Sequence, residues 1–392
     1  MTATPPAPRC VLVVAPEYPP TTGGMQTLGR TLVRGLAART EVHIAVQRGQ
    51  SRPVSEGESS VTFIDFRGNF EKRKRREHRD EMLALAERTK ADVVHLLNAG
   101  CAALVGERWN ETGPPAVVHV AGKDFTSPWI RFGFSADKAK GEIVEGLNAA
   151  GAVIAISEFT RSALRDGGVT RAIDLVVPGV EPVPPSTAEL PLPFARSAAD
   201  PLVLCVARHE RRKGQHLLLD AVARVRDSIP RLRLVVTSDG PERANLEAQA
   251  TRLELRDRVL FVGRVEPAVL AALYRAADVF ALTPLVLRDG AKVDYEGFGI
   301  VYAEAASVGV PSIASRSGGA CEAVRDGETG LVVPEGDVEA LTAALVRMTQ
   351  DHALRAKLGA NARARYENEG TVDAMVDRLV GIYGRMMRVG GE

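Results

Sequence analysis

The stretch DYEGFGIVYAEAASVGVP, from Asp294 to Pro311, decides how the rest of the chain is interpreted. A glycine-rich loop leads into a run of small and apolar residues, which predicts a helix beginning near Gly299 to Val301. Gly309 and Pro311 follow this run, as expected at the end of a helix. The free N–H groups in the first turn of such a helix suit a phosphate group.

Two glutamates, Glu296 and Glu304, flank the predicted phosphate position. Carboxylates accept hydrogen bonds from hydroxyl groups, and a nucleotide sugar carries hydroxyls on both sides of its diphosphate. The alternative is a solvated pair of glutamates on an ordinary helix. The candidate positions for binding such a nucleotide sugar lie between the glutamates: Gly297, Phe298, Gly299, Ile300 and Val301.

The 392-residue chain has a globular composition, with 45% apolar and 25% charged residues. Its length favours two or three domains. A net charge of +1 argues against a nucleic-acid-binding protein that relies on bulk positive charge. The N-terminus lacks the features of a signal peptide, and no apolar run is long enough to cross a membrane. We therefore expect a cytoplasmic protein.

The cysteines are scattered and form no Cys-x-x-Cys pair. This spacing favours free thiols in a reducing compartment over disulfides or zinc. The residues concerned are Cys10, Cys101, Cys205 and Cys321.

Short apolar runs alternate with helical patterns in two parts of the chain, which predicts parallel sheets covered by helices. The predicted fold class is α/β, with Rossmann-like domains at residues 1–180 and 202–370. The Pro-rich segment 181–201 between them is the predicted linker. Strands are predicted at Cys10–Ala15, Val42–Val46, Val61–Phe66, Asp92–Leu97, Ala116–Val120, Ala152–Ile156, Ile173–Val177, Leu202–Ala207, Arg231–Val236, Val259–Val262, Val279–Leu282 and Ser312–Ser315.

A basic loop, VARHERRKGQHLLLDAV, follows the first predicted strand of the second domain. The guanidinium of Arg208 and the ammonium of Lys213, beside a helix N-terminus, can clamp a diphosphate. They would also stabilise the negative charge that builds as the diphosphate leaves. The alternative is a solvated turn, because His209, Arg211 and Arg212 crowd the same loop and cannot all be ligands.

These motifs together resemble the retaining family 4 glycosyltransferases, which have the GT-B fold. The dense part of the match runs from Leu204 to Leu331, and the loop Pro284–Tyr295 resembles the phosphatidylinositol mannosyltransferase branch. The resemblance implies two Rossmann-like domains facing each other across a cleft. It also implies that the last helix, residues 371–392, crosses back onto the first, acceptor-binding domain.

The resemblance assigns roles to individual positions. It implies that Glu296 holds a sugar hydroxyl and that Glu304 holds the ribose. It places the pair Gly23 and Gly24 against the donor diphosphate. Arg264 falls where the family holds the nucleotide base, although a plain surface position is an equal alternative.

One departure concerns the end of the predicted strand Ala116–Val120, where the family has a His-Gly pair. If Gly122 is the family glycine, the histidine position holds Ala121. His119 lies two residues earlier and could take over the role, because residues two apart on a strand share a face. Alternatively, His119 is a hydrogen-bonded histidine at a strand end.

The function implied is metal-independent, retaining transfer of a hexosyl group. The donor is a UDP- or GDP-linked sugar, and the acceptor is a hydroxyl group of a lipid, glycan or natural product. The catalytic candidates are Arg208, Lys213, His119 and Glu296. No Asp-x-Asp is present, and the two basic groups would supply the positive charge of a metal, so neither metal nor cofactor is expected. The alternatives are a nucleotide-sugar-binding protein with weakened or lost catalysis, and a GT-B-fold sugar-nucleotide epimerase.

A run rich in basic residues, EKRKRREHR, covers Glu71–Arg79, and its basic part is Lys72–Arg79. Such a run is usually a solvated helix face. The other interpretation is contact with anionic lipid, which would place the protein peripherally on the inner face of a membrane.

Overall fold

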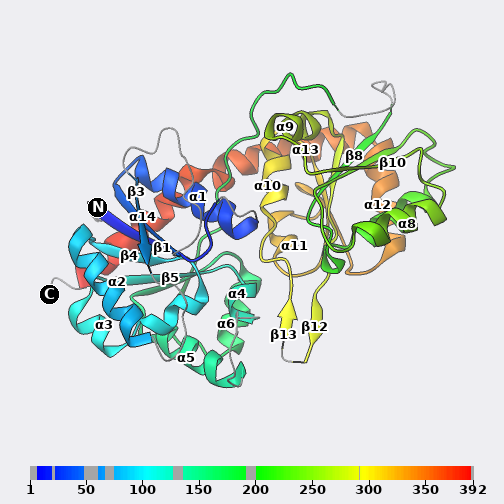
Figure 1. Ribbon diagram of the computed structural model, residues 1–392. Coiled ribbons are helices and arrows are strands. Elements are labelled where there is room, and N and C mark those ends of the chain that lie inside the picture. Colours follow the sequence, from blue (N-terminus) through cyan, green and yellow to red (C-terminus); the bar gives the residue numbers. More distant parts are fainter. Residues whose placement is uncertain are drawn as a thin grey trace. The chain divides into compact units, whose positions relative to one another are not determined.

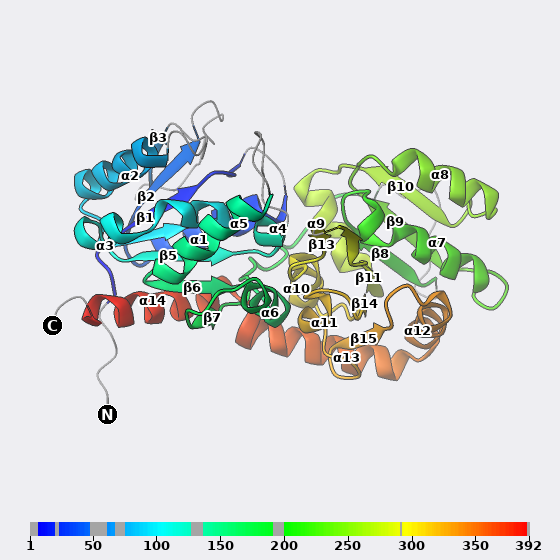
Figure 2. The same ribbon diagram turned by 90° about the horizontal axis from the view of Figure 1, so that it is seen from below.

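The computed structural model describes residues 7–19, 23–47, 61–66, 75–126, 136–190, 200–290 and 292–389. The chain divides into two compact units (Figures 1 and 2). The first unit contains Met1–Val180 and Val372–Glu392, and the second contains Glu181–Thr371. None of the described helices is both long and apolar enough to cross a membrane.

The first unit is built on a seven-stranded sheet in the order β3-β2-β1-β4-β5-β6-β7, with every neighbouring pair parallel. Parallel strands need crossover connections, and helices supply most of them here. The strands are β1 (Cys10–Ala15), β2 (Glu41–Gln47), β3 (Val61–Phe66), β4 (Val93–Leu96), β5 (Ala116–Val120), β6 (Ala152–Ala155) and β7 (Ile173–Leu175). The helices are α1 (Gly24–Ala37), α2 (Arg75–Thr89), a 3₁₀ helix (Ala99–Leu104), α3 (Glu107–Thr112), α4 (Lys123–Thr126), α5 (Ala136–Ala149), α6 (Glu158–Asp166) and α14 (Val372–Val389).

The second unit repeats the design with a six-stranded parallel sheet in the order β10-β9-β8-β11-β14-β15. The strands are β8 (Leu202–Val206), β9 (Arg233–Thr237), β10 (Val259–Gly263), β11 (Val279–Ala281), β14 (Ser312–Ser315) and β15 (Gly330–Val333). The helices are a 3₁₀ turn (Arg211–Lys213), α7 (Gln215–Arg224), α8 (Arg243–Arg252), α9 (Pro267–Ala276), α10 (Ile300–Ser307), α11 (Ala320–Ala323), α12 (Val338–Gln350), α13 (His352–Arg365) and a π-helical turn (Tyr366–Gly370). Two parallel-sheet, Rossmann-like units confirm the predicted fold class.

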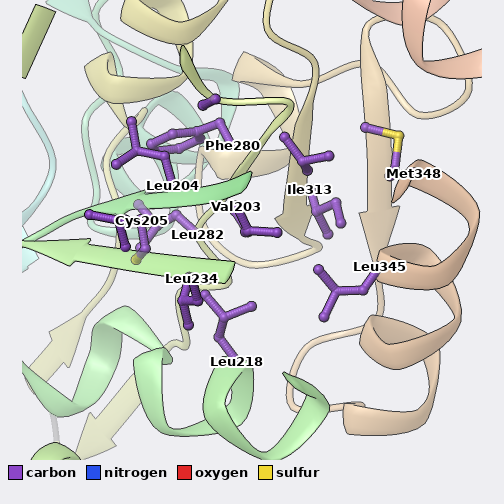
Figure 3. Packing of buried hydrophobic residues seen from close by; sticks show 14 of the residues in the cluster. Val203, Leu204, Cys205, Leu218, Leu234, Phe280, Leu282, Ile313, Leu345 and Met348 are labelled. Atoms are coloured by element: carbon purple, nitrogen blue, oxygen red, sulfur yellow. The ribbon is translucent and has the colours of Figure 1, made fainter. Parts of the chain in front are cut away.

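Buried apolar side chains fix these elements in place. Every residue of β1 is buried, as expected for a central strand covered on both faces. Helix α7 buries Leu218, Leu219 and Val222, a spacing that forms one helical stripe. Figure 3 shows Leu218 with strand residues of the second sheet and with Leu345 of α12.

One hairpin and one strand were not predicted. The segment Pro284–Tyr295 contains an antiparallel hairpin, β12 (Leu287–Asp289) and β13 (Lys292–Asp294). Strand β15, which follows the turn-rich residues 326–329, is absent from the predicted strands, and it pairs in parallel with β14. Both are short, and the turn residues beside them masked the strand signal.

The segment predicted as a linker is counted with the second unit. Its first residues are attached there: Val183 N donates to Ser307 Oγ at 3.0 Å, and Ser186 Oγ donates to Ala268 O at 2.6 Å. The residues 191–199 lie outside the described part of the chain. Helix α14, which corresponds to the predicted last helix at 371–392, is counted with the first unit.

In both sheets the direction of chain progression reverses between two central strands, β1 and β4 in the first sheet and β8 and β11 in the second. Open α/β sheets bind ligands at the carboxyl ends of the strands beside such a switch point. In the second unit, the loops leaving β8 and β11 lead to Lys213 and Glu296, respectively. In the first unit, the loop leaving β1 leads to Gly23.

Candidate functional site

Lys213 and Glu296 meet at the switch point of the second sheet. Lys213 Nζ donates to Glu296 Oε2, and Arg212 Nη1 donates to the same oxygen at 3.2 Å. The three side chains are only 13–15% exposed. Two loops that are distant in sequence thus bring a carboxylate between two cations.

This arrangement keeps Glu296 ionised. Burial alone would raise its pKa, but the charges and hydrogen bonds of Lys213 and Arg212 outweigh burial and lower the pKa. The carboxylate is therefore a hydrogen-bond acceptor at neutral pH, as contact with a sugar hydroxyl requires.

Arg212 is a contributor that sequence reasoning missed. Besides Glu296, its Nε lies 3.1 Å from Glu210 Oε2 and 3.3 Å from Asp294 Oδ1. These three carboxylates raise the pKa of Arg212 despite its burial. The sequence showed only a crowded basic turn, and nothing in it marked which cation points inward.

The loop that carries Arg208 and Lys213 is held by its own backbone. Gly214 has φ 69°, which favours glycine, and an added Cβ would lie 1.9 Å from Thr283 O. Gln215 is buried and its Nε2 donates to the carbonyls of Ala207 and Arg208 at 3.1 and 3.2 Å. The Arg208 side chain itself is 58% exposed and lies 3.3 Å from Glu210 Oε1.

The loop before α10 is fixed from the other side by Gly318 and Gly319. Gly319 N donates to Glu296 O at 2.8 Å. Gly318 has φ 54°, and an added Cβ would lie 2.5 Å from Glu296 O. The backbone of Glu296 is thus packed against a turn where only a glycine fits.

Helix α10 begins at Ile300, as predicted, after Gly299 in the left-handed conformation with φ 86°. Phe298 beside it is buried, and Gly297, Ile300 and Val301 are half-buried. The first turn therefore offers backbone N–H groups near Glu296.

Glu304 lies one turn further along α10. Its Oε2 accepts a hydrogen bond from Tyr274 OH at 2.6 Å. Burial raises the pKa of Glu304, and the tyrosine partly opposes this. Glu304 thus pairs with a tyrosine, whereas Glu296 pairs with two cations, so the two glutamates have different surroundings within the second unit.

The remaining donor-binding candidates are exposed. Arg264 is exposed directly after β10. Gly23 and Gly24 are exposed at the start of α1, and an added Cβ on Gly24 would meet nothing within 4 Å. Their predicted contacts with a donor stay predictions.

His119 belongs to a buried polar chain in the first unit. Its Nδ1 lies 3.2 Å from His95 Nε2, and His95 Nδ1 lies 2.6 Å from Tyr383 OH in α14. Burial lowers the pKa of His119 to about 4, so the ring is neutral at pH 7. Its Nε2 is buried and has no hydrogen-bond partner among the residues that the structure describes.

The loop after His119 is organised by Asp124. Its carboxylate accepts from Ala99 N at 2.8 Å and from Ala121 N at 3.1 Å, so it ties the loops after β4 and β5 together. Burial raises the pKa of Asp124 to about 6, while the backbone hydrogen bonds oppose the rise. Ala121 lies beyond the end of β5, so it does not share a strand face with His119.

Part of the basic run Lys72–Arg79 lies outside the described residues. Helix α2 begins at Arg75, Arg76 is exposed, and His78 is buried. Arg79 Nε donates to Leu104 O at 3.1 Å. The described end of the run is therefore only partly available to a membrane.

Two family models match the chain. The model described as glycosyltransferase family 4 matches residues 22–183. The model described as glycosyl transferases group 1 matches residues 193–365. Together they cover most of both units, and the second includes the loops of Lys213 and Glu296.

Among curated proteins, one relative is the GDP-mannose-dependent alpha-(1-6)-phosphatidylinositol monomannoside mannosyltransferase of Mycolicibacterium smegmatis. It is 36% identical over 222 residues, which is 55% of this chain and 57% of the relative. A D-inositol 3-phosphate glycosyltransferase of Thermomonospora curvata is 34% identical over 191 residues, covering 46% of this chain and 42% of the relative. The matches thus span about half the length of these relatives.

Solved structures share the fold over nearly the whole chain. Sucrose-phosphate synthase from Thermosynechococcus elongatus has a TM-score of 0.76 and 24% identity, covering 97% of this chain and 100% of that one. The Anabaena protein HepE in complex with UDP has a TM-score of 0.72 and 19% identity, covering 95% and 98%. At these identities the likeness concerns the fold alone.

Proposed function

Because this chain belongs to the GT-B glycosyltransferases, with a family 4 domain followed by a group 1 domain, we propose that it transfers a hexosyl group from a nucleoside diphosphate sugar to a hydroxyl acceptor. The observation that carries the proposal is the cluster of Lys213, Arg212 and Glu296 at the switch point of the second sheet. It offers cations for a diphosphate and an ionised acceptor for a sugar hydroxyl.

The cluster suits a ligand that carries both kinds of group. When no sugar donor is bound, Glu296 and Lys213 pair with each other. Neither is then a lone buried charge, which would cost free energy. When a diphosphate enters, Lys213 would contact both the diphosphate and Glu296. Arg208, on the exposed side of the loop, would contact the diphosphate as well. The hydroxyls of the sugar would then take up lone pairs of Glu296.

The same cations would stabilise the leaving diphosphate. Negative charge grows on the phosphate oxygens as the glycosidic bond breaks, and fixed cations there favour the transition state over the ground state. We propose that the reaction retains the anomeric configuration and needs no metal. Lys213 and Arg208 would supply the charge that a metal gives elsewhere.

The donor is a UDP- or GDP-linked sugar. GDP-mannose is the first donor to test, because several relatives are named as GDP-mannose-dependent enzymes. The acceptor is proposed only as a hydroxyl group on a lipid, glycan or natural product. A cytoplasmic protein, peripheral on a membrane through Lys72–Arg79, would be compatible with a lipid acceptor.

The test combines donor binding with turnover. The melting temperature should rise with the correct nucleoside diphosphate and its sugar, since a ligand of the folded state stabilises it. With a suitable acceptor, NMR of the product should show the anomeric configuration of the donor. EDTA should leave the rate unchanged. Inversion, or a loss of rate that magnesium or manganese restores, would contradict the proposed mechanism.

The second candidate is a nucleotide-sugar-binding protein with weakened or lost catalysis. Ala121, where the family has histidine, and the inward pairing of His119 with His95 favour it. Such a protein would bind the donor without transferring or hydrolysing it. An epimerase would instead convert the donor sugar without an acceptor.

A further inference from the structure

A second cluster of reactive side chains lies at the amino ends of β1 and β2. The loop that carries Gly23 follows the opposite, carboxyl end of β1. Cys10 and Glu41 are the first residues of these strands and stand opposite each other in the parallel pairing. His43 lies two positions further along β2. Since side chains two apart on a strand share a face, Glu41 and His43 project to the same side of the sheet.

The potential ligand atoms lie close together. Cys10 Sγ, a carboxylate oxygen of Glu41 and a ring nitrogen of His43 all lie within 4.8 Å of one another. His43 Nε2 is 3.0 Å from Glu41 Oε1. Bonds of about 2.0–2.3 Å to one zinc ion would hold three such atoms roughly 3–4 Å apart. Small side-chain rotations are therefore sufficient to form the site.

Two side chains of the cluster are shielded from solvent and the third is exposed to it. Cys10 is 5% exposed, the His43 side chain is 14% exposed and the Glu41 side chain is 61% exposed. His43 Nδ1 is buried and has no partner among the described residues. The thiol of Cys10 donates a hydrogen bond to Thr89 O at 3.3 Å, which leaves the lone pairs of the sulfur available to a metal. Two of the three groups thus retain unused bonding capacity.

The electrostatic surroundings favour a metal that binds sulfur. The carboxylates of Glu41 and Asp92 lie close enough to Cys10 for their charges to act on its thiol. The same negative charges attract a cation, and a metal bound to sulfur displaces the thiol proton. Asp92 also accepts from Cys10 N at 3.0 Å, which fixes the start of β1.

A hollow of about 620 Å³ adjoins the three side chains and leaves room for a water ligand. Basic residues, Arg9, Arg88 and Lys90, line the same hollow. Their positive charges oppose the attraction of the carboxylates for a cation, so charge alone would contribute little to the affinity for a metal. A thiolate and an imidazole bind zinc by donating electron pairs, which hard cations such as magnesium do not exploit.

We propose that Cys10, Glu41 and His43 form a zinc site that clamps β1 to β2, with water as the fourth ligand. On binding, the thiol proton of Cys10 passes to solvent and the sulfur bonds to the metal. The site lies away from the carboxyl-end loops, so it stabilises the first domain without taking part in glycosyl transfer.

The test uses untagged, chelator-treated protein titrated with cobalt(II). We expect one equivalent to bind with a sulfur-to-cobalt charge-transfer absorption that zinc(II) abolishes. Cys10→Ser should remove the absorption. Glu41→Gln should weaken zinc binding at least tenfold, because even the loss of an outer-shell partner costs about 10–100-fold. Cys321→Ser is the matched control and should behave as the wild type, since its thiol lies in the other unit.

The melting temperature gives an independent readout. Zinc should raise it for the wild type and for Cys321→Ser, and at the same zinc concentration should raise it less for Glu41→Gln, whose exposed side chain is not needed for folding. A wild type without the cobalt absorption overturns the proposal. So does an absorption that persists in Cys10→Ser, or a zinc-induced stabilisation of Glu41→Gln as large as that of the wild type.

Discussion

Lys213 donates a hydrogen bond to Glu296, a residue 83 positions further along the chain. The contact joins the loop after β8 to the loop after β11, and Arg212 contacts the same carboxylate. Both side chains are largely shielded from water, so their opposite charges compensate each other. Loss of Glu296 would take from Lys213 the carboxylate that compensates its charge, whereas loss of Lys213 would leave Glu296 paired with Arg212.

Lys213→Ala and Arg208→Ala should each lower the catalytic rate about 10²–10³-fold, as expected when a group that stabilises developing charge is removed. The Michaelis constant for the donor should change much less. Arg208→Lys should not restore full activity, because an ammonium cannot replace the planar fork of a guanidinium. Steady-state kinetics with the identified donor and acceptor would measure these effects.

Arg211→Ala is the matched control for this experiment. Arg211 lies in the same 3₁₀ turn, carries the same charge and is exposed. It should keep near wild-type kinetics. Equal losses for Arg211 and Lys213 would show that the loop contributes only general positive charge.

Glu304→Ala should lower the affinity for both the donor and the free nucleoside diphosphate by about 1–3 kcal/mol, because the proposed partner of Glu304 is the ribose, which both ligands carry. Glu296→Ala should weaken donor binding but leave the diphosphate nearly unaffected. Isothermal titration with the two ligands separates these cases. An unchanged diphosphate affinity of Glu304→Ala would remove Glu304 from the ribose site.

Gly318→Ala should reduce donor binding, because the new methyl group would lie 2.5 Å from Glu296 O and displace the Glu296 loop. Gly327→Ala is the control. Gly327 has φ 70°, so both variants carry a similar left-handed strain of about 1–2 kcal/mol. An added Cβ on Gly327 meets nothing within 4 Å. A lower donor affinity of folded Gly318→Ala than of folded Gly327→Ala would confirm the role of the turn, and equal affinities would contradict it.

The dependence of stability on pH should respond oppositely to two substitutions in the first unit. The pKa of His119 falls from 6.5 to about 4 on folding. Between these values the unfolded chain binds a proton that the folded chain does not, so His119 lowers stability as pH falls. The pKa of Asp124 rises from 3.8 to about 6, so between these values the folded chain binds the extra proton and gains stability.

His119→Gln should therefore lose less stability than the wild type between pH 7 and about 4.5, and Asp124→Asn should lose more. Urea denaturation at a series of pH values measures this difference as slopes, independently of how far each variant is destabilised at neutral pH. Equal slopes for all three proteins would contradict the assigned burial of both groups.

The fold could be predicted because buried parallel strands appear in the sequence as continuous runs of apolar residues. Cys10–Ala15 and Ser312–Ser315 are uninterrupted runs of apolar or small residues, Ala116–Val120 is broken only by His119, and each forms the predicted strand. The hairpin Leu287–Asp294 could not be predicted in this way, since it has little buried side to impose an alternating pattern.

The candidate site was partly visible in the sequence. Lys213 and Glu296 were chosen independently, and the fold brings them into contact. The inward turn of Arg212 and the pairing of Tyr274 with Glu304 depend on tertiary packing and leave no local pattern. The cluster of Cys10 and His43 was missed for the same reason: cysteine spacing argued against zinc, whereas strand pairing assembles ligands from separate segments.

Helix α14 has a consequence for the synthesis of the protein. It buries Met375, Leu379 and Tyr383 in the first unit, and Tyr383 contacts His95, 288 residues earlier. During synthesis, residues 181–371 all emerge from the ribosome before this helix does. The second domain can thus be complete while the first still exposes the apolar surface that α14 will cover. Until residues 372–389 emerge, the earlier half of the chain is the part that chaperones must protect.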